Sequence, residues 1–277
     1  MSNVLKFGQR ITPSRANGGI TTGAIAILLC HQANTDTAIT DISGSGLGSS
    51  AAGAGFVPAT HFAGVDGVTT PDASGVTDFA QRVPQANFNY DFTSGDSVLL
   101  AGRMKLTSGY PASTKPIIAQ GGAGTAAQGL RLSMNATTGL LVMIWDGPST
   151  QQFGASTDVA PPSSGWFHYV FASWNHTPAA GTTNYGIWIN GARAYTAFPK
   201  TGSSLTTTMT PAEAFRIGAY FRASGPTCNS IGATHASIHA YRAPQAVAQT
   251  TAKMDALAKR LWRDPETPLS LAEWPMA

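Results

Sequence analysis

Residues 166–175 of the chain are WFHYVFASWN, and residues 185–198 are YGIWINGARAYTAF. Both segments are rich in aromatic and β-branched side chains, which favour the extended backbone of a strand. Within the second segment Asn190-Gly191 separates two runs of alternating apolar residues. This dipeptide favours the tight turn of a two-residue hairpin. The two segments therefore predict a long strand followed by a β-hairpin.

Segments of strand length with turn residues between them continue on both sides of this hairpin. In residues 97–106, SVLLAGRMKL, every second residue from Val98 to Leu106 is apolar or Gly, and Arg103 and Lys105 alternate with them. Strands of this kind bury one face and leave the other in water. Further segments of strand length are residues 21–32, 115–120, 129–135, 140–147, 214–221 and 233–242. Together they predict an all-β fold, a two-sheet antiparallel jelly-roll sandwich.

The C-terminal part has a different periodicity. Apolar residues recur at helical spacing from Val247 to Leu261, with Pro244 where a first helical turn tolerates it and Pro265 after the last turn. We therefore expect a short C-terminal helix. The expected organisation is an N-terminal arm (1–20), one jelly-roll domain (21–263) and an extended, Pro-rich C-terminal tail (264–277).

The composition is unusual in its low charge. Charged residues make up 11% of the 277 residues, less than half of the ~25% of an ordinary soluble domain. Few surface charges mean little repulsion between copies, which favours a protein that lives in an assembly. The net charge is +3 and no run of Lys or Arg occurs, so we expect no nucleic-acid partner.

The N-terminal sequence predicts no targeting to a membrane. It contains no apolar signal segment, and the stretch from Ala24 to Cys30 is too short to span a bilayer. We expect no membrane partner, and synthesis in a host cytoplasm without a signal peptide. Cys30 and Cys228 are best interpreted as two reduced thiols, although a single disulfide between the first and last strands stays open.

Several segments, taken in order, resemble the laminin-G-like branch of the concanavalin-A-like lectin jelly rolls. WFHYVFASWN (166–175) is similar to the family's W-h-h-v-a-x-x-w strand, and YGIWINGAR (185–193) is similar to its l-Y-i-N-G hairpin. The other matching segments are ILLCHQ (27–32), DISGSG (41–46), DFTSGDSVLLAGRMK (91–105), FRIGAY (215–220) and ASIHAYRAPQ (236–245). In residues 91–105, Gly102 or Arg103 stands where the family often has Trp. The resemblance spans residues 21–263 and implies the jelly-roll fold.

The fold does not decide the function, because this family includes lectins, calcium-dependent binders, glycanases and viral structural proteins. Our hypothesis is a non-enzymatic structural or surface protein of a bacteriophage virion. It would be a capsid decoration, tail or fibre component, with host-surface binding as a further role. The expected partners are other virion proteins, further copies of the chain in a homo-oligomer, and cell-surface glycan. Two alternatives stay open, a lectin-like polysaccharide-binding module and an unconventional glycanase.

No catalytic residues are predicted. Retaining glycanases need two carboxylates about 5–5.5 Å apart, usually supplied by one strand. Glutamate occurs only at Glu213, Glu266 and Glu273, all outside the predicted strands, and no predicted strand carries paired acids. A G-x-S-x-G nucleophile motif is also missing from the sequence.

The histidines do not predict a metal site. They are His31, His61, His168, His176, His235 and His239. His235 and His239 are expected on one strand face, about 13 Å apart, which is too far for one zinc ion. Calcium is the one cofactor left open, because related domains often hold it at the rim of the sandwich. Its candidate ligands are the acids Asp146 and Asp158, with Asp66 and Asp72 as further contributors.

Aromatic residues are the candidate ligand-binding positions. Trp145 and Trp188 alternate with the apolar residues Ile144, Ile187 and Ile189, so we expect both rings on the outer face. Together with Tyr220 they are candidates for a glycan platform or a subunit interface, and Tyr185 and Tyr241 are weaker ones. The resemblance implies that Trp166 and Trp174 belong to the core.

Overall fold

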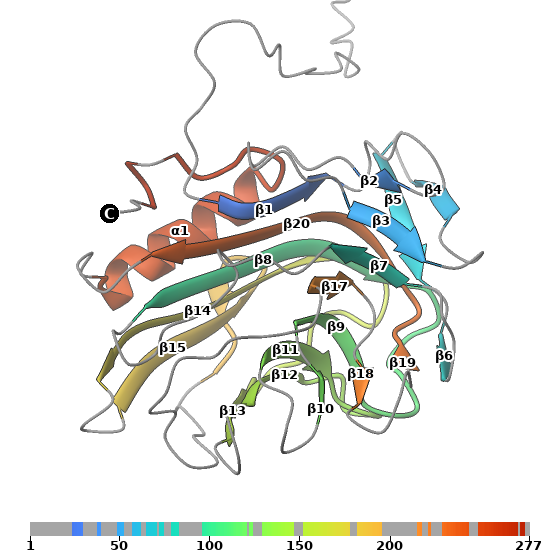
Figure 1. Cartoon of the computed structure of the whole chain (residues 1–277), viewed down its shortest axis with the longest axis horizontal. Coiled ribbons are helices and arrows are strands. Elements are labelled where there is room, and N and C mark those ends of the chain that lie inside the picture. The colour runs from blue at the N-terminus through green and yellow to red at the C-terminus, as the bar shows by residue number, and fades with distance from the viewer. Residues whose placement is uncertain are drawn as a thin grey trace, which may run out of the picture.

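The structure is a computed structural model, shown in Figure 1. It describes residues 24–29, 38–39, 49–52, 57–61, 65–70, 72–74, 79–82, 96–120, 122–123, 129–146, 152–177, 182–195, 215–217, 221–222, 229–243, 249–270 and 272–274. The predicted N-terminal arm and the residues Cys30, Cys228 and Tyr220 lie outside these ranges.

Two large sheets form the sandwich, and every pairing within them is antiparallel. Sheet 1 has the spatial order β16 (Ala192–Arg193), β15 (Thr182–Ile189), β14 (Trp166–Thr177), β8 (Ser97–Leu106), β20 (Ala233–Ala243), β5 (Val65–Thr70) and β4 (Val57–His61), and β1 (Ala24–Leu29) also pairs with β20. Sheet 2 has the order β13 (Gln152–Ser156), β12 (Leu141–Asp146), β11 (Gly129–Met134), β9 (Lys115–Gln120), β17 (Phe215–Ile217), β7 (Phe79–Arg82), β3 (Ser49–Ala52) and β2 (Ala38–Ile39). The predicted two-sheet antiparallel sandwich is confirmed.

Two short pairs complete the described strands. β10 (Gly122–Ala123) is parallel to β18 (Phe221–Arg222), and β6 (Ala73–Ser74) is antiparallel to β19 (Asn229–Ser230). The predicted turn at Asn190-Gly191 joins β15 to β16, with positive φ angles of 51° and 75° at its two residues.

The main core lies between the two sheets. The inward residues of β8 are those that the alternation predicts, from Val98 through Leu100 and Met104 to Leu106. Their partners across the sandwich come mainly from β9, β11, β12 and β17: Ile117, Ile118, Leu130, Leu132, Met134, Leu141, Met143 and Ile217. Burial of these aliphatic side chains is the dominant favourable term that holds the two sheets together.

The predicted C-terminal helix is present as α1 (Thr251–Arg263), although it begins four residues later than Val247. Thr250 has an extended backbone, and its hydroxyl accepts a hydrogen bond from the Lys253 amide at 3.2 Å. It is therefore the N-cap, which explains the later start. α1 lies across the outer face of sheet 1, opposite to sheet 2 (Figure 1).

A second apolar cluster lies between sheet 1 and α1. It joins outward residues of four strands to the buried face of the helix and to the tail: Leu99, Ala101, Val170, Ala172, Trp174, Trp188, Tyr241, Ala243, Met254, Leu257, Ala258, Leu261, Leu269 and Trp274. β8 and β14 are therefore buried on both faces along part of their length. The one-sided burial expected for residues 97–106 was wrong for Leu99 and Ala101, because α1 covers them.

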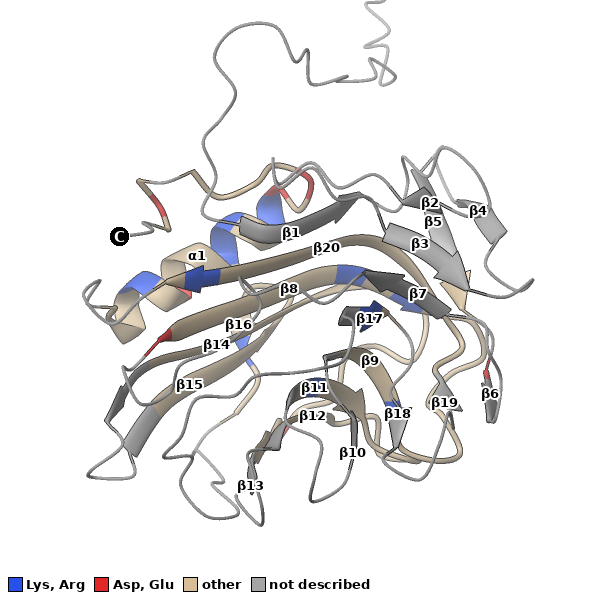
Figure 2. Ribbon diagram, in the orientation of Figure 1, with Lys and Arg blue, Asp and Glu red and all other residues tan. Residues whose placement is uncertain are grey.

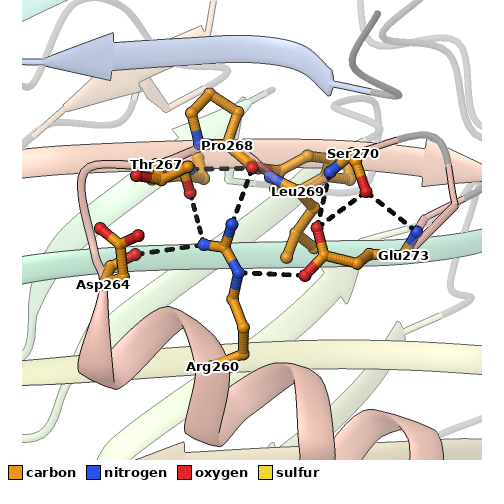
Figure 3. A network of polar contacts seen from close by, with 9 residues as sticks. Arg260, Asp264, Thr267, Pro268, Leu269, Ser270 and Glu273 are labelled. Atoms are coloured by element: carbon orange, nitrogen blue, oxygen red, sulfur yellow. Dashed lines mark hydrogen bonds and ion pairs between the residues drawn. The ribbon is translucent and has the colours of Figure 1, made fainter. Parts of the chain in front are cut away.

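Arg260 connects α1 to the C-terminal tail (Figure 3). Its guanidinium donates to the main-chain oxygens of Thr267 at 2.6 Å and Pro268 at 3.1 Å, and to the Glu273 carboxylate at 3.0 Å. Glu273 also accepts hydrogen bonds from the amide and the hydroxyl of Ser270. The described part of the tail therefore folds back over α1 and sheet 1 and does not extend away from them.

A chain of hydrogen bonds under the tail requires a neutral histidine. The Leu269 amide donates to the Tyr241 hydroxyl at 2.8 Å, and the Tyr241 hydroxyl lies 3.1 Å from Nδ1 of His239. Nε2 of His239 lies 2.7 Å from the Pro265 carbonyl, which can only accept, so Nε2 carries the proton. Nδ1 is then free to accept from Tyr241. A second proton on the ring would remove this acceptor.

We predict that acid destabilises the fold through its buried histidines. Burial lowers the pKa of His168 to about 3, with help from His239 and Arg103, and lowers that of His235 and His239 to about 4. The nearby Arg260 also lowers the pKa of His239, while its bond to Pro265 and the charge of Asp264 oppose the shift. In the unfolded chain these rings take up protons near pH 6.5, so stability is full above that pH. It is lost as the pH falls toward 4, by about 2 kcal/mol per histidine at pH 5.

Urea unfolding at pH 7.5, 6 and 5 measures this loss. The variant His239→Gln should show a shallower pH dependence than the unmodified chain, because one of the three titrating groups is gone. Equal stability at pH 7.5 and pH 5 would contradict the prediction.

Candidate functional site

The outer face of sheet 1 changes from apolar to polar side chains where α1 ends. Beyond the apolar cluster, two rows of polar side chains run across β14, β8 and β20. The register pairs Trp166 with Lys105 and Lys105 with Thr234, and it pairs His168 with Arg103 and Arg103 with Ser237. We call these six residues the polar end of the outer face.

Three members of the polar end reach the surface. Trp166, Arg103 and Lys105 are partly exposed. The Arg103 guanidinium carbon lies 5.2 Å from the centroid of the Trp166 ring, a cation–π contact. Trp166 was expected in the core, and this was wrong because α1 covers Trp174 but not the opposite end of β14.

Two further members are buried and lack hydrogen-bond partners. Both ring nitrogens of His168 and the hydroxyl of Ser237 are enclosed without any partner in the part of the chain that the structure describes. They flank Arg103 on either side in the register. The two side chains therefore lie beside Arg103 but beneath the surface.

Thr234 closes the polar end toward β5. Its hydroxyl lies 2.9 Å from that of Thr69, the residue paired with it on β5. Thr69 is partly exposed, and Thr234 is buried. The hydroxyl pair adds hydrogen-bonding capacity beside the two cations.

The last turn of α1 borders the polar end through the β15–β16 turn. Trp262 is 47% exposed and its ring lies against Gly191, where an added Cβ would come within 2.7 Å of the indole. The adjacent Asn190 exchanges hydrogen bonds with the main chain of His168, at 2.8 and 2.9 Å. Because Gly191 has no side chain, Trp262 at the end of α1 can pack against the β15–β16 turn, next to His168 of the polar end.

Charge at the polar end is positive. Figure 2 shows that the basic positions of β8 lie in the half of the strand away from its acidic N-terminal end. The ion pairs between described residues are Lys115–Asp72, Arg193–Asp255, Arg242–Asp96 and Arg260–Glu273, and none of them includes Arg103 or Lys105.

Trp188 does not form a surface platform. It lies on the outer face of β15, as the alternation predicts, but α1 covers it and it is only 1% exposed. Its indole N–H donates to the Asp255 carboxylate at 2.9 Å, and the same carboxylate binds Arg193. The expectation of an exposed Trp188 was wrong, because the sequence pattern did not show where the helix would pack.

Most of the other predicted candidates have side chains outside the described set. Trp145 pairs with Leu130 in the register of β12 and β11, and its side chain lies outside the described set, as does that of Asp146. Met143 is buried in the main core and Ile144 is partly exposed, and the outward position of Trp145 stays a prediction. Asp158 is an exposed residue whose amide donates to the Ala194 carbonyl. Among the described residues no group of three potential metal ligands occurs, and calcium binding stays a prediction.

Two tyrosines considered as weaker glycan candidates are buried. Tyr185 lies in the main core and Tyr241 in the second cluster. Burial raises the pKa of both phenols well above its usual range, so neither is set up as a nucleophile.

His235 and His239 lie on opposite faces of β20. A register shift between His235 and Ser237 pairs His235 with Met104 of the main core, and His239 with Ala101 of the second cluster. The expectation of a shared face was wrong because a β-bulge inserts one residue and reverses the alternation.

The sequence contained one signal for the polar end. On β8 the outward residues change from Leu99 and Ala101 to Arg103 and Lys105. This switch marks where apolar cover stops. Trp166 could have been placed there only with the register of β14 against β8, which the sequence does not state.

Comparison with known proteins shows the fold. No family model matches the sequence, and no curated protein matches it. Trypanosoma rangeli sialidase in complex with sialic acid is similar in structure, with a TM-score of 0.56 and 15% identity over 88% of this chain and 33% of the sialidase. The binding domain of botulinum neurotoxin DC in complex with rat synaptotagmin II has a TM-score of 0.59 and 13% identity, over 88% of this chain and 52% of that chain.

A third similar structure is that of botulinum neurotoxin type C, whose cell entry depends on two ganglioside molecules. Its TM-score is 0.56 at 13% identity, over 85% of this chain and 50% of the toxin chain. The chain thus spans about a third of the sialidase and about half of the toxin chains. At these identities the likeness establishes a shared β-sandwich fold. Among the described residues no helix is long and apolar enough to cross a membrane.

The unpartnered state of Ser237 can be tested with a matched pair of variants. We predict that Ser237→Ala changes the free energy of unfolding by less than about 0.5 kcal/mol, because no hydrogen bond is lost. Thr70→Val should cost about 1–3 kcal/mol, because the Thr70 hydroxyl donates to the Ile231 carbonyl at 2.6 Å and its loss leaves that buried carbonyl short of a donor. Urea unfolding at pH 7.5 measures both, and a loss for Ser237→Ala as large as for Thr70→Val would contradict the assignment.

Proposed function

We propose that this chain is a carbohydrate-binding module without catalytic activity, and that the sugar binds at the polar end of the outer face. The observation that carries the proposal is the partly exposed Trp166 ring, held on a long strand, with Arg103 over the ring and Lys105 opposite it in the register. Sugars present apolar C–H faces that stack on indole rings and hydroxyl groups that hydrogen-bond to polar side chains. A site on rigid strands holds such groups with little loss of conformational freedom.

The comparisons support this proposal in one respect. Two of the similar proteins are described with a sugar ligand, sialic acid for the sialidase and gangliosides for the toxin. They share the β-sandwich fold with this chain at low sequence identity. That this chain also binds a sugar is our proposal.

The chemistry of the described residues supports a binding role over catalysis. Of the three glutamates, Glu213 lies outside the described residues, Glu273 is engaged by Arg260 and Ser270, and Glu266 is an exposed residue of the tail. Neither Glu266 nor Glu273 lies on a strand beside a second carboxylate, which glycoside hydrolysis usually requires. An unconventional glycanase is the alternative, and it would release new reducing ends.

We further propose that the chain works as a surface component of a bacteriophage virion, made in the host cytoplasm. Its 17 basic and 14 acidic residues are few for 277 residues, and such a surface suits close packing with other copies or other particle proteins. In that setting glycan binding would attach the particle to its host.

Glycan binding is tested on an array of bacterial surface polysaccharides and sialylated glycans. We predict saturable binding that Trp166→Ala weakens by about tenfold or more, as the loss of a central Trp contact does at other interfaces. Val159→Ala is the control, because it removes an exposed apolar side chain that is not part of the polar end. Equal losses in both variants would argue against the polar end as the site. New reducing ends in the bound polysaccharide would overturn the non-enzymatic assignment.

The assembly role predicts a defined oligomer. Light scattering on a sizing column, with and without calcium, should give a trimer or a larger species instead of the 28.7 kDa monomer. A monomer at all concentrations would contradict the assembly role and would not affect the glycan-binding proposal.

A further inference from the structure

We infer that the ligand of the polar end is an acidic sugar, one that carries a carboxylate beside its ring. This inference rests on the proposed carbohydrate binding and names the class of glycan. It comes from the arrangement of Arg103, Lys105, Trp166, His168 and Ser237 on three neighbouring strands.

Arg103 is held beside the Trp166 ring and has the donor set that a planar anion requires. Its guanidinium carbon lies over the ring, 5.2 Å from the ring centroid, and a guanidinium is a planar group with five N–H donors. The N–H donors point outward from the edge of that plane, in the fork geometry that fits both oxygens of a carboxylate. The indole thus holds the cation in place and leaves its donors for a ligand.

Lys105 adds a second positive charge on the same face. It lies two residues along β8 from Arg103, about 7 Å for an extended strand. Its direct neighbours in the register, Trp166 and Thr234, are uncharged. Among the described residues of these rows there is no Asp or Glu, so two like charges stand close together without a compensating acid. A bound carboxylate would relieve this repulsion.

His168 and Ser237 flank Arg103 without adding a negative charge. Each is the register neighbour of Arg103, each is buried, and neither has a hydrogen-bond partner in the described structure. Because these atoms are enclosed, a ligand at the surface would contact Arg103 and Lys105, which are partly exposed. A neutral sugar would leave the two cations uncompensated.

The decisive experiment compares two acidic polysaccharides, each in a native and a reduced form. Polysialic acid and alginate are each prepared in their native form and after reduction of every carboxylate to an alcohol, and binding to the full chain is measured by calorimetry. Dextran sulfate is included as a polymer that carries charge without carboxylates. We expect the native forms to bind at least about tenfold more tightly than the reduced forms, as one charge-assisted bidentate contact would give.

Variants locate the effect on the chain. Arg103→Gln should weaken binding of the native form about tenfold and bring it close to that of the reduced form, while Arg103→Lys should keep only part of the affinity because the fork is lost. Lys259→Gln is the control, since Lys259 is an exposed cation on α1 away from the polar rows, and it should bind as the unmodified chain does. The comparison of the two polysaccharide forms needs no variant, so it stands even if Arg103→Gln does not fold.

The outcomes separate the inference from the proposed function. Equal binding of native and reduced forms would overturn the acidic ligand and leave carbohydrate binding intact. Binding of dextran sulfate as tight as that of the carboxylated polymers would overturn it as well, because charge alone would then explain the attraction. Binding of no polysaccharide at all would overturn the proposed function itself.

Discussion

The structure depends on the burial of both faces of sheet 1. One face packs on sheet 2, as in any sandwich, but the other also carries large apolar side chains, among them Leu99, Trp174 and Trp188. Left in water, that outer face would lose the stabilisation that apolar burial provides, about 1.5–3 kcal/mol for each large side chain. α1 and the C-terminal tail supply the missing cover, and they make the fold a three-layer arrangement.

Hydrogen bonds and ion pairs fix the position of α1 and the tail on sheet 1. Asp255 of α1 binds both Trp188 and Arg193, so the helix is tied to β15 and β16 at one position. Arg260 of α1 binds the Thr267 carbonyl and the Glu273 carboxylate of the tail. The hydrogen bonds from Leu269 to Tyr241, and between Tyr241 and His239, join the tail to β20. Apolar burial drives the association of these layers, and the hydrogen bonds choose the register in which they associate.

The candidate site lies on the part of the outer face of sheet 1 that α1 and the tail do not cover. α1 ends beside the β15–β16 turn, and beyond it the outer face of sheet 1 carries cations, hydroxyls and the partly exposed indole of Trp166. A long sheet with a short helix must have such an uncovered part, and residues there are free to serve binding instead of packing. The stiffness of β8, β14 and β20, each paired on both sides, gives these side chains fixed positions from which to meet a ligand.

The local sequence determined the strands, the hairpin turn and the helix, because these depend on short-range patterns. The alternation in residues 97–106, the Asn190-Gly191 turn and the helical spacing that ends near Leu261 all appear in the structure. Only the tertiary structure decided what lies over the second face of a strand. Trp188 was expected at the surface and is buried, and Trp166 was expected in the core and is partly exposed, because position relative to α1 governs both. Alternation tells which residues share a face, whereas the burial of that face depends on a helix some 60 to 100 residues away along the chain, and no local pattern contains that contact.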